Sequence, residues 1–81
     1  MHIQILGAGC AKCSLLAENA DAAAKECHVN YTLEKVADIA RIIAFDVLKT
    51  PALVIDGKLQ CSGVVPTVEE IKAMILTAGN T

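Results

Sequence analysis

The stretch Gly7-Ala8-Gly9-Cys10-Ala11-Lys12-Cys13 joins two segments with different hydrophobic periodicity. Before it, residues His2 to Leu6 alternate between polar and apolar side chains, which predicts a β-strand. After it, the segment from Ala11 to about Cys27 is rich in Ala, Leu, Lys and Glu, which favour a helix. The two cysteines of the stretch therefore stand at a junction between a strand and a helix.

The predicted helix has one apolar stripe, and the second cysteine belongs to it. Apolar residues recur every three or four positions, which is the spacing of a single helix face. The stripe consists of Cys13, Leu16, Ala20, Ala23 and Cys27. Because Cys10 precedes the stripe, we expect an exposed Cys10 and a buried Cys13.

The position of the pair favours a reactive dithiol. Three residues along a helix turn a side chain by about 300°, which brings two sulfur atoms within reach of a disulfide. Unpaired N–H groups at a helix start favour a thiolate, and Lys12 adds a nearby cation. We therefore expect Cys10 to attack a substrate and Cys13 to resolve the mixed disulfide.

A second strand and a short helix are predicted next. Residues Asn30 to Lys35 alternate weakly, as a strand does. Asp38 is a suitable N-cap for a helix whose apolar face contains Ile39, Ile42 and Ile43. Strands and helices thus alternate through the first half of the chain.

The second half predicts a hairpin. Pro51 cannot donate to a sheet ladder and suits the start of a strand. The apolar run Ala52 to Ile55 is typical of a central strand that is buried on both faces. Asp56-Gly57 then predicts a tight turn, with Lys58 to Ser62 as the returning strand.

A capping box marks the last helix, since Thr67 precedes Glu70 by three residues.

The predicted order is β-α-β-α-β-β-α. This order indicates an α/β fold in which a four-stranded mixed sheet carries helices on both faces. At 81 residues, we expect residues 1–81 to form a single domain.

Composition excludes several classes of partner. The net charge is −2 and the basic residues are scattered, which argues against nucleic acid. No apolar run approaches the roughly 20 residues that span a bilayer, and the start of the chain lacks the features of a signal peptide. We expect a cytoplasmic protein without a membrane partner. In that compartment, a close cysteine pair is more often catalytic or metal-binding than structural.

The cysteine stretch, followed about forty residues later by Thr-Pro-Ala-Leu-Val-Ile-Asp-Gly, resembles the thioredoxin fold family. More closely, it resembles the small thioredoxin-like proteins that are often called redox-active disulfide proteins. The resemblance implies thiol–disulfide exchange with a disulfide-containing protein or a small thiol, and a separate reductase. It also implies a cis Pro51, although the residues alone favour trans. The implied substrate groove contains Gly9, Ala11, Lys12, Thr50, Pro51 and Gly63.

The sequence departs from the family pattern in two places. Gly9 stands where thioredoxins usually carry Trp, and Ala11-Lys12 replaces Gly-Pro between the cysteines. The family's buried aspartate lies six residues before the first cysteine, and that position is Gln4, which cannot accept a proton from Cys13.

Two other functions fit a Cys-X-X-Cys pair. One is a chaperone-like module for copper or zinc, although copper domains typically have Met where this chain has Ala8. The other is a non-catalytic redox sensor or interaction domain. For Cys27 and Cys61 we expect core packing, so no cofactor or metal site is predicted.

Overall fold

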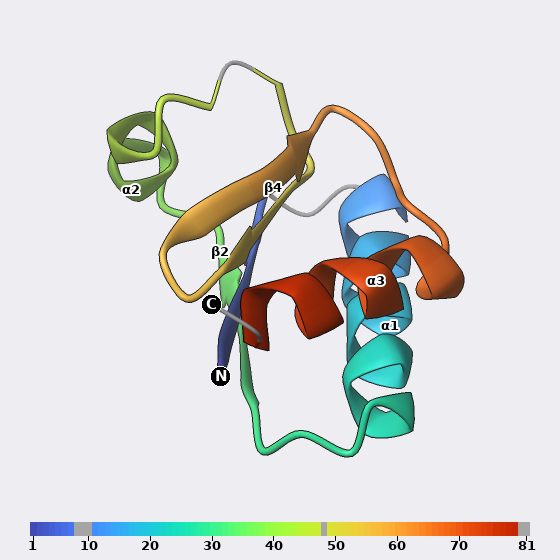
Figure 1. Ribbon diagram of the computed structural model, residues 1–81. Coiled ribbons are helices and arrows are strands. Elements are labelled where there is room, and N and C mark those ends of the chain that lie inside the picture. Colours follow the sequence, from blue (N-terminus) through green and yellow to red (C-terminus); the bar gives the residue numbers. More distant parts are fainter. Residues whose placement is uncertain (8–10, 48, 80–81) are drawn as a thin grey trace.

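The computed structural model describes residues 1–7, 11–47 and 49–79. It confirms the predicted α/β class and the element order β-α-β-α-β-β-α (Figure 1). The elements are β1 His2–Leu6, α1 Ala11–Glu26, β2 Thr32–Val36, α2 Ile39–Ala44, β3 Ala52–Ile55, β4 Lys58–Ser62 and α3 Val68–Gly79.

The four strands form one mixed sheet in the order β2-β1-β3-β4. β1 is parallel to β2 and antiparallel to β3, and β4 returns antiparallel to β3. The ends of β1, β2 and β4 therefore lie at the same end of the sheet as the start of β3. Figure 1 shows this end at the top, where α1 also begins.

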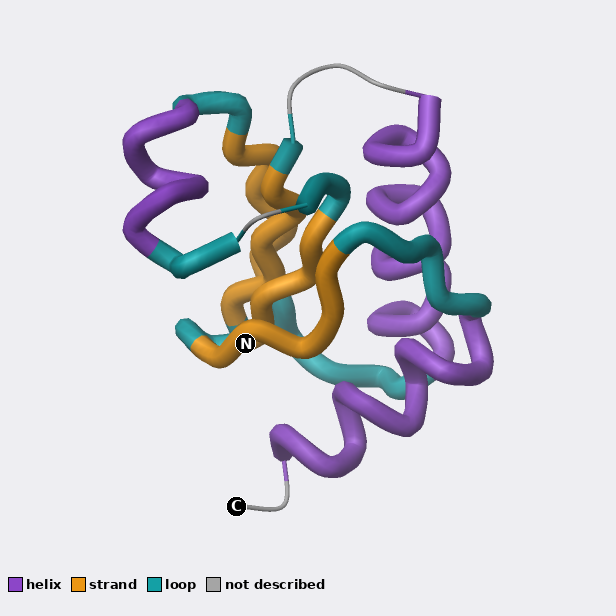
Figure 2. Tube along the Cα trace, turned by 90° about the horizontal axis from the view of Figure 1, so that it is seen from above, coloured by secondary structure: helices purple, strands orange, loops and turns teal. Residues whose placement is uncertain are grey.

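The sheet lies between helices on both of its faces. Figure 2 shows α2 on one side of the strands and α1 with α3 on the other. Residues of β1 alternate between the two faces, as strand geometry requires. Ile3 and Ile5 face α1 and α3, whereas Leu6 belongs to the cluster on the α2 side.

The core on the α1 and α3 side is aliphatic. The predicted stripe of α1 is buried from Cys13 to Ala23, with Leu16 and Ala20 fully buried. Leu15, which lies off the stripe, is 49% exposed. Ile71 and Ile75 of α3 complete this core. The 3.6-residue period of α1 thus identified the buried face correctly.

The short helix α2 covers the other face with less apolar contact than the sequence predicted. Its N-cap is Asp38 as predicted, and the carboxylate accepts a hydrogen bond from the Ala40 N–H at 2.9 Å. Of the three isoleucines expected in the core, only Ile42 is buried, while Ile39 and Ile43 are 69% and 64% exposed. A helix of six residues rests on the sheet along one narrow line, which leaves the flanking positions in solvent.

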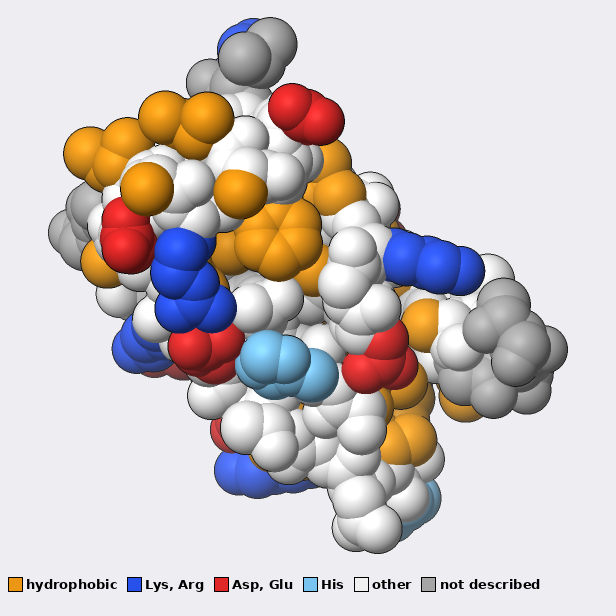
Figure 3. Space-filling view, turned by 90° about the vertical axis from the view of Figure 1, so that its left-hand side faces the viewer, with side chains coloured by type: hydrophobic (Ala, Val, Ile, Leu, Met, Phe, Trp, Pro, Cys, Tyr) orange, Lys and Arg blue, Asp and Glu red, His pale blue; other side chains and the backbone are white. Residues whose placement is uncertain are grey.

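A polar network fastens α2 to the sheet beside this small core. The Glu34 carboxylate accepts hydrogen bonds from both Arg41 guanidinium nitrogens at 3.1 Å and from Gln4 Nε2 at 3.0 Å. His2 Nε2 lies 3.3 Å from the same carboxylate. These contacts, Arg41 first, lower the pKa of Glu34 to about 2. Figure 3 shows hydrophobic side chains in the upper part of this face, over α2, with basic, acidic and histidine side chains together below them.

The predicted turn and cap in the second half of the chain are confirmed. Asp56 and Gly57 both have positive φ, at 49° and 82°, as a tight hairpin turn of this type requires. The Thr67 hydroxyl accepts a hydrogen bond from the Glu70 N–H, and the Glu70 carboxylate accepts one from the Thr67 N–H. This reciprocal capping box fixes the start of α3.

Candidate active site

The candidate active site lies at the end of the sheet where β1 stops and α1 begins. The Gly7 N–H donates to the Val36 carbonyl at 2.9 Å and holds the end of β1 against β2. Cys13 enters this region from the first turn of α1. Thr50 and Pro51 reach it from the start of β3. Segments that are distant in the sequence therefore converge on one end of the fold.

Cys13 is buried, as its place on the stripe predicted, and is 7% exposed. Its Sγ lies so close to Gly7 that a Cβ at position 7 would overlap with the sulfur. The same Cβ would lie 3.6 Å from Thr50 Cβ. Gly7 is therefore required at this position because the sulfur occupies the space that a side chain needs.

The peptide bond between Thr50 and Pro51 is cis, as the family resemblance implied. Pro51 is buried and Thr50 is exposed. The Gly63 N–H donates to the Pro51 carbonyl at 2.8 Å, which joins the end of β4 to this turn. Gly63 has φ of 75°, a conformation that favours glycine, and a Cβ there would press on the Lys49 side chain.

The remaining predicted site residues divide into two groups. Ala11 and Lys12 are exposed in the first turn of α1, at the same end of the sheet as Thr50. Gly9 and Cys10 lie outside the described residues. The structure thus brings Cys13, Thr50, Pro51 and Gly63 to one end of the fold.

Gln4, which stands at the position that the resemblance gives to the family's buried aspartate, does not face α1. Gln4 is 6% exposed, and its amide donates to Glu34 on the α2 face of the sheet. Strand alternation turns the next residue, Ile5, toward α1 instead. Ile5 pairs with Lys35 in the parallel ladder, so these two side chains share the face that Cys13 approaches.

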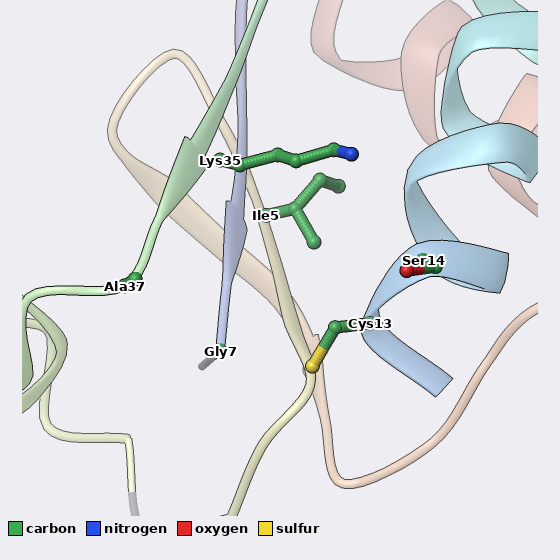
Figure 4. Close-up of a pocket in the computed structure, with 6 residues that line it drawn as sticks. All are labelled: Ile5, Gly7, Cys13, Ser14, Lys35 and Ala37. Carbon is green, nitrogen blue, oxygen red and sulfur yellow. The ribbon is translucent and has the colours of Figure 1, made fainter. Parts of the chain in front are cut away.

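A hollow of about 210 Å³ opens between Cys13 and β2 (Figure 4). It is lined by Ile5, Gly7, Cys13, Ser14, Lys35 and Ala37. Lys35 extends across Ile5 toward α1, and the Cys13 sulfur points toward Gly7 (Figure 4). Sequence reasoning did not single out Lys35, Ser14 or Ala37 as site residues. The parallel register of β1 with β2 was the missing information, because it places Lys35 beside Ile5.

The other two cysteines are only partly buried and pack against the core on the α1 and α3 side. Cys27 Sγ lies 3.9 Å from the Lys72 carbonyl oxygen. Burial raises the pKa of the Cys61 thiol, which disfavours its reactive thiolate form. Within residues 1–7, 11–47 and 49–79, no cluster of three or more His, Cys, Asp or Glu side chains has the arrangement of a metal site.

None of the described helices combines the length and the apolar character needed to cross a membrane.

Comparison with known proteins identifies the family. Residues 1–76 match the family described as thioredoxin domain. A thioredoxin of Methanothermobacter thermautotrophicus is 39% identical over 75 residues, which cover 93% of this chain and 97% of the relative. A thioredoxin of Methanocaldococcus jannaschii is 37% identical over 70 residues, or 86% of this chain and 80% of the relative. The chain therefore belongs to the thioredoxin domain family of thiol–disulfide oxidoreductases.

Proposed function

We propose that the chain exchanges disulfides through Cys10 and Cys13, with Cys10 as the attacking thiol and Cys13 as the resolving thiol. The burial of Cys13 against Gly7 is the observation that supports this division of roles. A buried thiol is shielded from a protein substrate, while it can attack a neighbouring sulfur within its own chain. The surrounding Thr50, Pro51 and Gly63 border the groove in which the substrate binds, with Gly9, Ala11 and Lys12 beside the cysteines.

The reaction proceeds in two exchanges. The Cys10 thiolate attacks one sulfur of the substrate disulfide, and the other substrate sulfur leaves as a thiolate. The Cys13 thiolate then attacks Cys10 Sγ and releases the second substrate thiolate. The substrate gains two electrons, and the protein is left with a Cys10–Cys13 disulfide. A reductase or a small dithiol supplies the two electrons that restore the reduced protein.

A redox titration tests this function. The protein is equilibrated at a series of potentials, its thiols are alkylated, and peptide masses report the state of each cysteine. We expect one two-electron couple that is lost in Cys10→Ser and in Cys13→Ser. Cys27→Ser and Cys61→Ser are the matched controls and retain the couple, because these two thiols pack against the core and take no part in the proposed exchange.

Trapping separates the two roles. Cys13→Ser leaves Cys10 able to attack but removes the resolving thiol, so a mixed disulfide with the substrate accumulates on Cys10. Cys10→Ser forms no such adduct with a protein disulfide. A couple that involves Cys27 or Cys61 contradicts the proposal. So does a protein that carries stoichiometric metal and has no two-electron couple, which instead favours the chaperone-like alternative.

A further inference from the structure

We infer that the substrate groove selects a protein disulfide with acidic neighbouring residues, and that Lys12 and Lys49 bind the carboxylates. The inference rests on the proposed function, which seats its substrate in the groove at Thr50, Pro51 and Gly63. The two lysines come from different elements of the fold. Lys12 lies in the first turn of α1, and Lys49 lies in the segment before β3.

Lys49 lies along one side of Gly63. A Cβ at position 63 would come within 3.0 Å of Lys49 Cβ and 3.2 Å of Lys49 Cδ, so the aliphatic stem of the lysine runs across the glycine. The Gly63 N–H donates to the Pro51 carbonyl, which ties the same glycine to the cis turn. Because Lys49 is exposed, its stem covers the glycine and its ammonium group reaches solvent at the rim of the groove.

The contact between Asn19 and Pro66 locates Lys12 relative to the groove. Asn19 Nδ2 donates to the Pro66 carbonyl oxygen at 3.1 Å, so this face of α1 lies against the loop from β4 to α3. Lys12 precedes Asn19 by seven residues, which is two turns and the same helix face.

The lengths of the two segments bring Lys12 near the level of Gly63. Two helical turns rise about 10.5 Å, and the three residues from Gly63 to Pro66 span at most roughly 10–11 Å. Figure 1 shows this loop descending beside α1 from the end of the sheet where α1 begins. Lys12 and Lys49 therefore approach Gly63 from two different elements, α1 and the segment before β3.

Neither lysine is neutralised within the described part of the chain. There, the ion pairs of lysine and arginine side chains engage Lys25, Arg41 and Lys72, and none engages Lys12 or Lys49. Both of the latter side chains are exposed. A carboxylate that enters the groove thus meets two ammonium groups that hold no other carboxylate.

The carboxylates that are nearest along the chain are engaged or lie elsewhere. Glu18 lines a hollow on the β2 side of α1. Glu70 is held in the capping box, and Glu69 lies 3.7 Å from Lys72. Asp46 follows the end of α2, which covers the other face of the sheet. The groove is therefore locally positive, although the whole chain has a net charge of −2.

The shape of the groove suits an extended protein segment. Gly63 has no side chain and allows the backbone of a substrate to approach closely. Val64, the next residue, is 55% exposed and offers an apolar contact. A segment that passes over Gly63 lies near both lysines, so acidic residues on either side of the substrate cysteine reach an ammonium group.

The selection is measured as a ratio of two rates. The pre-reduced chain is mixed with peptide dimers that are joined by one disulfide and carry either glutamates or glutamines beside the cysteine. Alkylation and mass readout then follow the peptide thiols released in a single turnover. We expect the acidic peptide to react faster, and Lys12→Gln and Lys49→Gln each to lower the ratio about two- to fivefold, the range typical of an exposed ion pair. The ratio cancels any effect of Lys12 on the reactivity of the neighbouring cysteines.

Two further variants and added salt sharpen the test. Lys49→Glu is expected to lower the ratio more than Lys49→Gln, because it places a carboxylate against the acidic peptide. Lys58→Gln, at the opposite end of the sheet, is the matched control for a lost lysine charge and leaves the ratio unchanged. Added salt brings the ratio of the wild-type chain toward one.

A binding titration tests the inference without cysteine chemistry. Peptides with serine in place of cysteine are added to the isotope-labelled chain, and NMR follows the backbone amide signals. We expect the acidic peptide to shift the signals of Thr50, Gly63 and Val64 at low salt, and the glutamine peptide to shift them less. Combining Lys12→Gln with Lys49→Gln should remove this difference.

The outcomes separate this inference from the proposed function. Equal rates for the two peptides, or a ratio that neither lysine variant changes, overturn the inference. A wild-type chain that reduces neither peptide overturns the proposed function instead. In that case the titration decides the inference, which fails if the acidic peptide causes no larger shifts than the glutamine peptide.

Discussion

The two faces of the sheet are stabilised by different means. The face toward α1 and α3 is covered by two long helices, and its aliphatic core contains eleven buried residues in the described part of the chain. Among the described residues, the face toward α2 has six buried apolar residues and a six-residue helix, and the Glu34 network adds polar contacts between α2 and the sheet. Buried apolar side chains carry no charge that pH can titrate or that salt can screen, whereas an exposed ion pair responds to both.

The candidate active site lies on the side of the sheet that has the larger aliphatic core. The buried Cys13 belongs to the helix with the larger aliphatic contact, so its sulfur is held by packing. α2 carries the exposed Ile39 and Ile43 and contributes nothing to the hollow at Cys13. The α1 face is therefore expected to set the stability of the site, and the α2 face to respond to solution conditions.

The largest expected effect is at Leu16, which is fully buried in the α1 face. Leu16→Ala removes buried methyl groups and leaves a cavity, and the expected loss in the free energy of unfolding is about 2–5 kcal/mol. Urea unfolding followed by circular dichroism measures it. Leu15→Ala on the same helix is the control, since Leu15 is 49% exposed, and is expected to change stability by less than about 0.5 kcal/mol. Equal losses for both variants would contradict the assigned helix face.

A smaller loss is expected at Ile42 on the α2 face. Ile42 is 7% exposed and packs in the smaller cluster, so Ile42→Ala is expected to cost about 2 kcal/mol, the low end for such substitutions. Ile43→Ala is the matched control because Ile43 is 64% exposed in the same helix. If Ile43→Ala destabilises the protein as much as Ile42→Ala, the exposed face of α2 is covered in solution and the description of this face is wrong.

Gly7 connects the α1 face to the site. Gly7→Ala places a methyl group where Cys13 Sγ lies, and the expected cost of this overpacking is about 1–3 kcal/mol. The displaced sulfur should also change the redox potential of the cysteine pair, which the alkylation titration measures. Gly57→Ala is the control for loss of a glycine: a Cβ there meets nothing within 4 Å, and although the positive φ of 82° makes this substitution cost stability, it leaves the potential unchanged. An unaltered redox potential in Gly7→Ala would contradict the claim that Gly7 sets the position of Cys13 Sγ.

The smallest expected effect concerns pH and belongs to the α2 face alone. The folded pKa of Glu34, about 2, lies below its ordinary value of 4.5 because Arg41 and Gln4 stabilise the carboxylate and His2 adds positive charge. Its contribution to stability is therefore complete above about pH 4.5 and is lost as pH falls toward about 2. Thermal unfolding of wild type and Glu34→Gln should show a difference that shrinks over this window and at high salt. A difference that is constant with pH would exclude this role for Glu34.

Several features were predictable because they depend on neighbours in the sequence. The helix stripe with Leu16, the turn at Asp56-Gly57 and the capping box of Thr67 and Glu70 all act within a few residues. Their physical causes are the helical period, the tolerance of positive φ and local hydrogen bonding. The family resemblance added the cis bond before Pro51, which these local rules alone did not favour.

Other features depended on how the elements pack. The sequence predicted Ile39 and Ile43 in the core, but a six-residue helix buries only one line of side chains. The count of residues before the first cysteine put Gln4 at the position of the family's buried aspartate, but strand alternation turns Gln4 to the α2 face of the sheet. A count of residues before a cysteine cannot detect this, because a shift of one residue at a strand end exchanges the two faces.

The sequence by itself determined the element order, the buried stripe of α1 and the cysteine pair at its start. Hydrophobic periodicity and helix capping depend only on residues that are a few positions apart in the sequence. The tertiary structure alone decided that Gly7 makes room for Cys13 Sγ and that Lys35 stands beside Ile5 over the same hollow. These neighbours lie on separate elements, and only the sheet register and the docking of α1 bring them together.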